Sequence, residues 1–287
     1  MLEDFKKYLI EEKLADNTIA SYINDVNIFL TFFKEHFGEE IIKLSHIEIA
    51  EYIKELKKAN TKATSINRKL AALSRYNMFL IKNNIQTEHV ISKKDYIKIQ
   101  SNMCAPYSPT AKDVFKIRLC AKDNKRDLAI LTLLAYSGIR ESELVHIELT
   151  DINLQARTII IKGKGNKVRT VLITDLIYNT LVDYIEERKA EGTYDKNKYL
   201  FIGRQEIENN KPLDRTTINS IIKKYAEKAN IYMHPHLFRD FFCTEAHRTK
   251  ALSIMQIAYL AGHSSINTTK KYIQIQEDEL FAQLNKV

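Results

Sequence analysis

The chain of 287 residues is 45% hydrophobic and 28% charged, a composition typical of a soluble globular protein that is long enough for two domains. Its formal net charge of +8 fits a polyanionic partner such as nucleic acid, although ordinary proteins also reach this value. The longest apolar run is too short to cross a bilayer, the N-terminus is unlike a signal peptide, and Cys104, Cys120 and Cys243 have the spacing of neither a zinc site nor a disulfide framework. We therefore expect a cytoplasmic protein with free thiols.

Residues 1–90 carry the repeated apolar spacing of amphipathic helices. The four patterns run over residues 5–14, 19–33, 47–56 and 66–81. Asp16 or Asn17 is expected to cap the second helix and Ser45 the third, because such side chains accept hydrogen bonds from the first helical turn. Four helices with short connections predict a small all-helical domain.

One face of the fourth predicted helix is basic. Arg68, Arg75 and Lys82 are seven residues apart, and this spacing places them in a line roughly opposite the apolar stripe. Such a line can follow a phosphate backbone, and it is equally typical of a helix face that is merely exposed to solvent. We treat the three residues as candidates for binding a polyanion.

Helical periodicity fades over residues 91–107, where prolines interrupt the chain, and this stretch is interpreted as a linker. Residues 108–287 then predict a second domain. Its expected helices cover residues 114–120, 128–136, 176–188, 216–230, 235–247, 253–261 and 265–272. Two β-rich runs at residues 157–163 and 167–174, joined by a short turn, predict a hairpin. The predicted fold is therefore mainly α with a small β-sheet.

Residues with chemically active side chains lie where these elements join. In chain order they are Arg140 in SGIRESEL, Lys164 in IKGKGNKVR, His236 and Arg239 in HPHLFRD, His263 in LAGHSS, and Tyr272 at the end of the helix that follows. Taken singly, each has a common structural explanation, such as a cap, a turn, an ion pair or, for one of 15 tyrosines, core packing. The prediction of function depends on their combination in this order.

The ordered series resembles the motifs of the tyrosine recombinase (phage integrase) family, particularly its compact Xer-like and transposon resolvase-like members. The resemblance covers the whole chain. Residues 1–90 resemble the family's core-binding (SAM-like) DNA-binding domain, and residues 108–287 resemble its mixed α/β catalytic domain with a C-terminal tail helix. It implies that the two domains form a clamp around DNA. Arg68, Arg75 and Lys82, chosen from their spacing alone, are then the candidate DNA-binding residues.

The resemblance also implies that the motif residues share one task, the transfer of a DNA phosphate to a tyrosine and back. The implied roles are scissile-phosphate binding for Arg140 and Arg239, support of the first arginine for Glu143, protonation of the leaving oxygen for Lys164, general base for His236, transition-state hydrogen bonding for His263, and nucleophile for Tyr272. Two guanidiniums match phosphate oxygens, and a 3′-phosphotyrosine keeps the energy of the broken ester. No metal, cofactor or ATP is therefore expected.

The implied activity is site-specific DNA recombination. Double-stranded DNA with paired inverted half-sites is the expected partner, bound by a homotetramer that joins two sites on the nucleoid and has no membrane role. The tail after Tyr272 has an apolar helical face, and we expect it to dock on a neighbouring protomer rather than on its own domain. Two alternatives remain open, a type IB topoisomerase-like relaxing enzyme and a non-catalytic DNA-binding regulator. Integration, excision, resolution and inversion are not distinguished.

Overall fold

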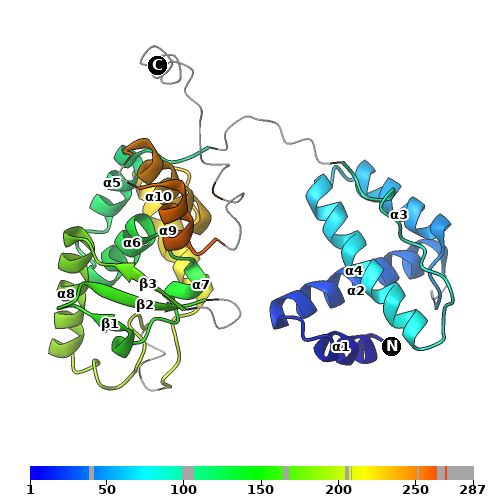
Figure 1. Ribbon diagram of the computed structural model, residues 1–287, viewed down its shortest axis with the longest axis horizontal. Helices are drawn as coiled ribbons and strands as arrows, with labels where there is room; N and C mark the ends of the chain where they lie inside the picture. Colours follow the sequence, from blue (N-terminus) through cyan, green and yellow to red (C-terminus); the bar gives the residue numbers. More distant parts are fainter. Residues whose placement is uncertain are drawn as a thin grey trace, which may run out of the picture. The chain divides into compact units, whose positions relative to one another are not determined.

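The computed structural model describes residues 1–38, 42–98, 107–163, 168–203, 207, 209–250, 252–263 and 269. The chain forms two compact units, Met1–Met103 and Cys104–Val287, each with its own hydrophobic core (Figure 1). Both units are mainly helical and the second contains a small sheet, which confirms the predicted fold class. Within the described part of the chain, no helix has the length and apolar character needed to cross a membrane.

The first unit contains the helices that the apolar spacing predicts. They are α1 (Leu2–Glu11), α2 (Asp16–Phe37), α3 (His46–Lys58) and α4 (Ala63–Lys82), and they bury their apolar faces against one another. Ser45 caps α3 through a reciprocal capping box with Glu48, as expected. The expected cap of α2 at Asp16 or Asn17 is wrong, because the N-cap is Ala15 and Asp16 lies in the first turn. Its carboxylate is favoured there by the helix dipole.

The packing of the first unit continues beyond residue 90. Val90 and Ile91 are buried in its core. The side chain of Asn67 binds the backbone of Ile97, because Nδ2 donates to the carbonyl at 2.9 Å and Oδ1 accepts from the N–H at 2.8 Å. Irregular backbone can pack in this way when side chains satisfy its hydrogen bonds, and an apolar periodicity does not reveal it.

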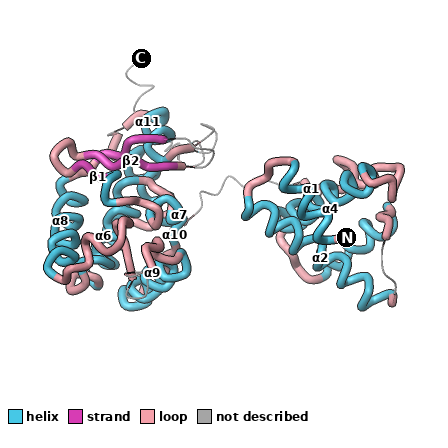
Figure 2. The backbone as a smooth tube through the Cα atoms, turned by 90° about the horizontal axis from the view of Figure 1, so that it is seen from below, coloured by secondary structure: helices cyan, strands magenta, loops and turns pink. Residues whose placement is uncertain are grey.

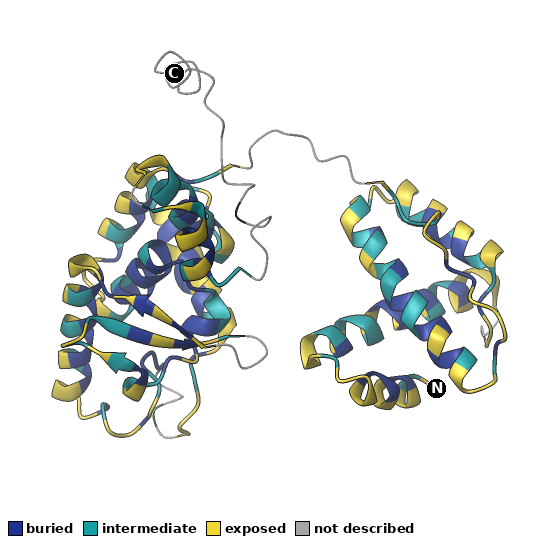
Figure 3. Cartoon of the chain, in the orientation of Figure 1, coloured by how far each residue is buried: buried dark blue, intermediate teal, exposed yellow. Residues whose placement is uncertain are grey.

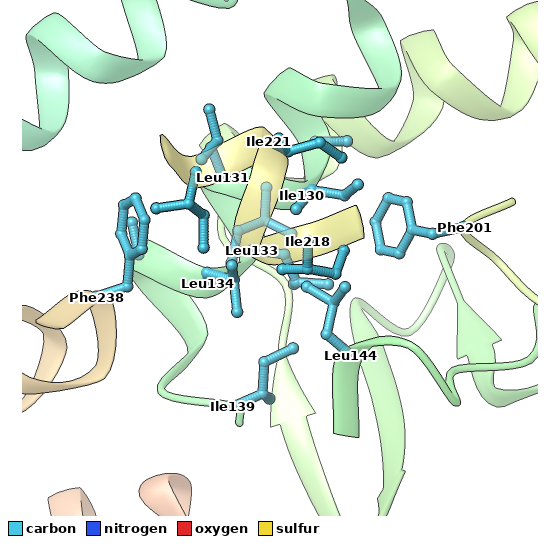
Figure 4. Close-up of a cluster of buried hydrophobic side chains, with 14 of the residues drawn as sticks. Ile130, Leu131, Leu133, Leu134, Ile139, Leu144, Phe201, Ile218, Ile221 and Phe238 are labelled. Carbon is cyan, nitrogen blue, oxygen red and sulfur yellow. The ribbon is translucent and has the colours of Figure 1, made fainter. Parts of the chain in front are cut away.

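The second unit is built around helix α6 (Lys125–Ser137), which is buried along most of its length (Figures 3 and 4). The other helices are α5 (Ala111–Cys120), α7 (Glu141–Leu144), α8 (Asp175–Ala190), α9 (Arg215–Ala229), α10 (Pro235–Arg248) and α11 (Ile254–Ala261), with a 3₁₀ turn at Leu149–Asp151. Helices α8 and α10 pack on α6, and α9 packs on α5. Helices α8 to α11 begin and end within two residues of the predicted bounds.

Three short strands form an antiparallel sheet beside these helices (Figure 2). Their order is β1 (Ile152–Asn153), β2 (Thr158–Lys162) and β3 (Val168–Leu172). Ile159 pairs with Val171 and Ile161 pairs with Arg169, and all four side chains are buried. Strands β2 and β3 confirm the predicted hairpin, while its turn at residues 164–167 lies outside the described residues. The predicted helix over residues 265–272 also lies outside them, apart from Thr269.

Arg188 holds the segment that follows α8. Its side chain is 1% exposed, and its guanidinium donates to five backbone carbonyls of that segment. The acceptors are Tyr199 at 2.6 Å, Leu200 at 2.9 Å, Thr193 at 2.9 Å, Asn197 at 3.0 Å and Tyr194 at 3.4 Å. A buried loop needs such donors, because its carbonyls have no ladder partner.

Replacing Arg188 with methionine should destabilise the second unit by about 3 kcal/mol or more, since each buried carbonyl left without a donor costs about 1–3 kcal/mol. Urea unfolding followed by circular dichroism measures the change. The control Lys189→Met alters the neighbouring exposed residue and should shift stability by no more than about 0.5 kcal/mol. Equal stability of the Arg188→Met protein and the wild type would contradict this account.

Candidate active site

The turn between α6 and α7 places Arg140. Helix α6 ends at Ser137, and Gly138 adopts the left-handed conformation, with φ of 67°, that turns the chain away from the helix axis. A Cβ on Gly138 would lie 2.5 Å from the ring of Phe242, so packing also requires glycine here. Arg140 then stands as the N-cap of α7 with an extended backbone. Its position therefore follows from a local turn motif.

Arg140 is held by Glu143 and by a distant carbonyl. Its backbone N–H donates to Glu143 Oε2 at 2.7 Å, and its Nη1 donates to Oε1 of the same carboxylate at 3.0 Å. Its Nη2 donates to the carbonyl of Gly262 at 2.8 Å. The guanidinium is thus fixed at both ends before any ligand binds.

A second arginine, Arg169 of β3, shares Glu143. Its Nη1 and Nη2 donate to the two carboxylate oxygens at 2.9 and 2.8 Å. Burial alone would raise the pKa of Glu143, but hydrogen bonds from Arg169 and the Arg140 backbone, with the charges of both arginines, hold that pKa below its ordinary value. Arg169 is the last residue of the IKGKGNKVR motif, but no role was assigned to it from the sequence. Its signal in the sequence is a charged residue on the inward face of an alternating strand, together with Val171.

Helix α10 presents His236 and Arg239 from its first turns. Pro235 begins the helix. His236 and Arg239 are three residues apart and therefore lie on the same face of it. Arg239 is 5% exposed, and its Nη1 donates to the carbonyl of Gly138 at 2.7 Å. Its Nη2 is buried and has no hydrogen-bond partner among the described residues. Burial, reinforced by the positive charge of Arg140, lowers the pKa of Arg239 to about 10.

These side chains line one solvent-open pocket. Its lining residues are Ile139, Arg140, Glu141, Ser142, Arg215, Pro235, His236 and Arg239. Arg215 of α9, whose Nε lies 3.2 Å from Glu141 Oε1, was not found from the sequence, because an exposed arginine in a first helical turn has no distinctive pattern. Arg239 Nη2, buried and without a partner in the described part of the chain, lies in a pocket with two more arginines, and this arrangement is suited to bind an oxyanion.

His263 follows the turn that ends α11. Gly262 is left-handed, with φ of 62°, and its carbonyl is the one that binds Arg140. His263 Nδ1 and Thr269 Oγ1 lie 2.7 Å apart in hydrogen-bond contact. Gly262 thus links His263 to Arg140, because it is bonded to His263 in the chain and its carbonyl accepts a hydrogen bond from Arg140. Lys164, Tyr272 and the tail after Tyr272 lie outside the described residues.

The three basic residues of α4 all have acidic partners. The ion pairs are Arg68 with Asp25, Arg75 with Glu12 at 4.0 Å, and Lys82 with Glu11 at 3.5 Å. The carboxylate of Asp25 is fully buried, whereas the glutamates are exposed. Exposed pairs contribute only about 0–1 kcal/mol, so Arg75 and Lys82 can exchange their partners for a phosphate at little cost. Exchange is more costly for Arg68, because the buried carboxylate of Asp25 would then keep only its longer contact with Lys69 Nζ, at 3.4 Å.

Comparisons with known proteins cover both units. Residues 110–279 match the model described as Phage integrase family, and residues 2–84 match Phage integrase, N-terminal SAM-like domain. The chain is 38% identical over 274 residues to the TnP I resolvase of Bacillus thuringiensis, covering 94% of this chain and 93% of the relative. It is 30% identical over 293 residues to a tyrosine recombinase of Pseudothermotoga lettingae, covering 100% and 98%.

Solved structures share the fold. The post-cleavage complex of XerH site-specific recombinase with a palindromic difH substrate has a TM-score of 0.74 at 18% identity, covering 93% of this chain and 78% of that one. A lambda integrase dimer bound to a COC′ core site has a TM-score of 0.73 at 15% identity, covering 96% and 79%. At these identities the likeness concerns the fold alone.

Proposed function

Because the chain belongs to the phage integrase family of tyrosine site-specific recombinases, we propose that it cleaves and rejoins double-stranded DNA through a 3′-phosphotyrosine at Tyr272. The observation that carries the proposal is the Arg140–Arg239 pocket, in which Arg239 Nη2 is buried without a partner among the described residues. A non-bridging oxygen of the scissile phosphate supplies the missing acceptor. The two guanidiniums then stabilise the negative charge that develops on the phosphate during attack.

The remaining motif residues move the protons. The phenol oxygen of Tyr272 attacks phosphorus, the bond to the 5′ oxygen breaks, and His236, which lines the pocket, accepts the phenol proton. Lys164 donates a proton to the leaving 5′ oxygen, and His263 donates a hydrogen bond to the phosphate. Rejoining reverses these steps with a 5′ hydroxyl as the nucleophile. Because arginines supply the positive charge that stabilises the phosphate, the reaction needs no metal ion and should proceed in the presence of a chelator.

The first unit supplies DNA contacts in this proposal. Arg75 and Lys82 bind backbone phosphates by leaving their exposed glutamates, and Arg68 contributes while it keeps its pair with Asp25. Four copies of the chain join two sites on the nucleoid, each site carrying inverted half-sites, and the tail after Tyr272 docks between neighbours. Among the proteins with the same fold, lambda integrase forms a tetramer on a Holliday junction.

The test is covalent capture of DNA. The full-length protein is incubated with sheared cellular DNA in EDTA, the reaction is stopped with detergent, and DNA that remains bound to protein is sequenced. A synthetic duplex of the enriched sequence, nicked close to the cleaved phosphate, then serves as a suicide substrate. We expect a detergent-stable adduct, and mass spectrometry should find the nucleotide on the peptide that contains Tyr272.

Two outcomes would contradict the proposal. One is the absence of any adduct with site-selected DNA. The other is cleavage without site preference together with relaxation of any supercoiled plasmid, which would indicate a type IB topoisomerase-like enzyme.

A further inference from the structure

Arg169 forms a buried, bidentate ion pair with Glu143 but does not line the pocket. Both of its terminal nitrogens bind Glu143, at 2.9 and 2.8 Å, and its Nε donates to the carbonyl of Leu260 at 2.9 Å. The side chain is 9% exposed and is not among the residues that line the pocket. A bidentate pair of this kind is geometrically specific for arginine.

The contacts of Arg169 close a ring. Arg169 binds Glu143 and Leu260, Glu143 binds Arg140, and Arg140 binds the carbonyl of Gly262, two residues beyond Leu260. A Cβ on Gly262 would lie 2.9 Å from the guanidinium carbon of Arg169, so the turn packs directly on this side chain. Since His263 is the next residue, the ring ties its position to that of Arg140.

The ring also sets the charge near the pocket. Arg140 and Glu143 alone would sum to zero, and a neutral pair attracts a phosphate weakly. With Arg169 included, the three groups carry one net positive charge. Because Glu143 binds two guanidiniums, its charge is shared between them, and Arg140 keeps more of its own charge for a ligand.

On the basis of the proposed function, we propose that Arg169 is a positioning residue for phosphoryl transfer. It matches the charge of Glu143 so that the charge of Arg140 is available to the scissile phosphate, and it holds the turn that carries His263 against Arg140. Arg169 therefore affects how Arg140 and His263 bind the scissile phosphate. It does not affect DNA affinity, because contacts elsewhere along the DNA dominate that affinity.

The test compares Arg169→Met, Glu143→Gln and the double variant on the nicked substrate in single turnover. Arg169→Met should lower the adduct rate at saturating protein by about 10²-fold, the typical cost of one lost clamp donor, with less than about a threefold change in the protein concentration that half-saturates DNA. Adding Glu143→Gln should recover at least about tenfold, because the uncompensated carboxylate charge is removed. If Arg169 were merely structural, adding Glu143→Gln would not recover the adduct rate.

A second readout does not depend on DNA cleavage. Sulfate should raise the melting temperature of the wild type by binding in the Arg140–Arg239 pocket. The rise should be smaller for Arg169→Met, and larger again for the double variant. Failure of the proposed function would appear as a wild type that forms no adduct while this sulfate pattern holds. Equal sulfate affinities in wild type and Arg169→Met would overturn the present proposal.

Two further variants complete the experiment. Arg157→Met is the matched control, because it removes an arginine at the other end of the same hairpin, where its partner is Asp175 at 3.2 Å; its adduct rate should stay within about twofold of wild type. Arg169→Lys is used if the methionine variant does not fold. It keeps the charge but not the bidentate contact, and we expect about a tenfold loss of rate at unchanged DNA affinity. A rate equal to wild type, or parallel losses of rate and affinity, would overturn the proposal.

Discussion

Replacing Tyr272 with phenylalanine is expected to abolish adduct formation, with a loss on the order of 10⁶-fold, while DNA binding stays within about twofold of wild type. The substitution removes one oxygen, which is the proposed nucleophile. Knocking out the nucleophile of a covalent enzyme typically costs this much, because no other group replaces the bond-forming step. Single-turnover reactions on the nicked substrate, resolved on denaturing gels, measure the rate, and mobility shifts measure binding.

The matched control is Tyr259→Phe. Tyr259 belongs to α11 and is 59% exposed, so loss of its hydroxyl should change neither stability nor rate appreciably. A Tyr272→Phe protein that still forms an adduct at more than a few per cent of the wild-type rate would show that another residue is the nucleophile. The remaining tyrosines would then be replaced one at a time.

Replacing Arg239 with methionine is expected to lower the adduct rate by about 10³-fold or more and yet leave the free protein at least as stable as the wild type. The rate falls because both charge and two donors of the phosphate clamp are lost. Stability is kept because burial lowers the pKa of Arg239 to about 10, which means that folding disfavours the charged form. This penalty is fully present below pH 10 and is relieved only as the pH rises above the folded-state pKa toward the higher pKa of the unfolded chain.

Methionine removes that penalty but leaves the buried carbonyl of Gly138 without its arginine donor, which costs about 1–3 kcal/mol, and we expect the two effects to offset each other. Thermal melting at neutral pH should therefore give a midpoint no lower than that of wild type. Sulfate at ten times its Kd should stabilise the wild type by ~1.4 kcal/mol and have no specific effect on Arg239→Met. Arg248→Met, an exposed position on the same helix paired with Glu245, is the control for both measurements. A strongly destabilised Arg239→Met protein would instead identify Arg239 as a structural residue.

Much of the fold followed from local patterns. Apolar spacing located the longer helices, α1 to α6 and α8 to α11, and the β2–β3 hairpin, because a helix or strand buries one face and the sequence repeats with that period. It did not predict the short elements α7 and β1. Glycine at position 138 and proline at position 235 marked the turns before Arg140 and before His236, since both residues act on their own backbone. The pocket then brings Arg140, His236 and Arg239 together.

Other features depend on residues that are far apart in the chain. Periodicity did not reveal that residues 90–97 pack on the first unit, nor that Asp25 lies buried beneath Arg68. The second arginine partner of Glu143 was not predicted either, because Arg169 is 26 residues away and reaches the carboxylate only when β3 lies beside the α7 turn. An ion pair of this kind is a property of packing, and no local propensity encodes it.

The amino-acid sequence by itself determined the longer helices and the hairpin in their order, the division into two units and the set of motif residues, because each follows from the spacing of residues close together in the chain. Only the tertiary structure decided which charges face one another. It showed that Arg239 is buried with a donor left without a partner among the described residues, that Arg215 completes the pocket wall, and that Arg169 balances Glu143. Burial and charge pairing depend on three-dimensional distance, and that distance exists only after the chain has folded.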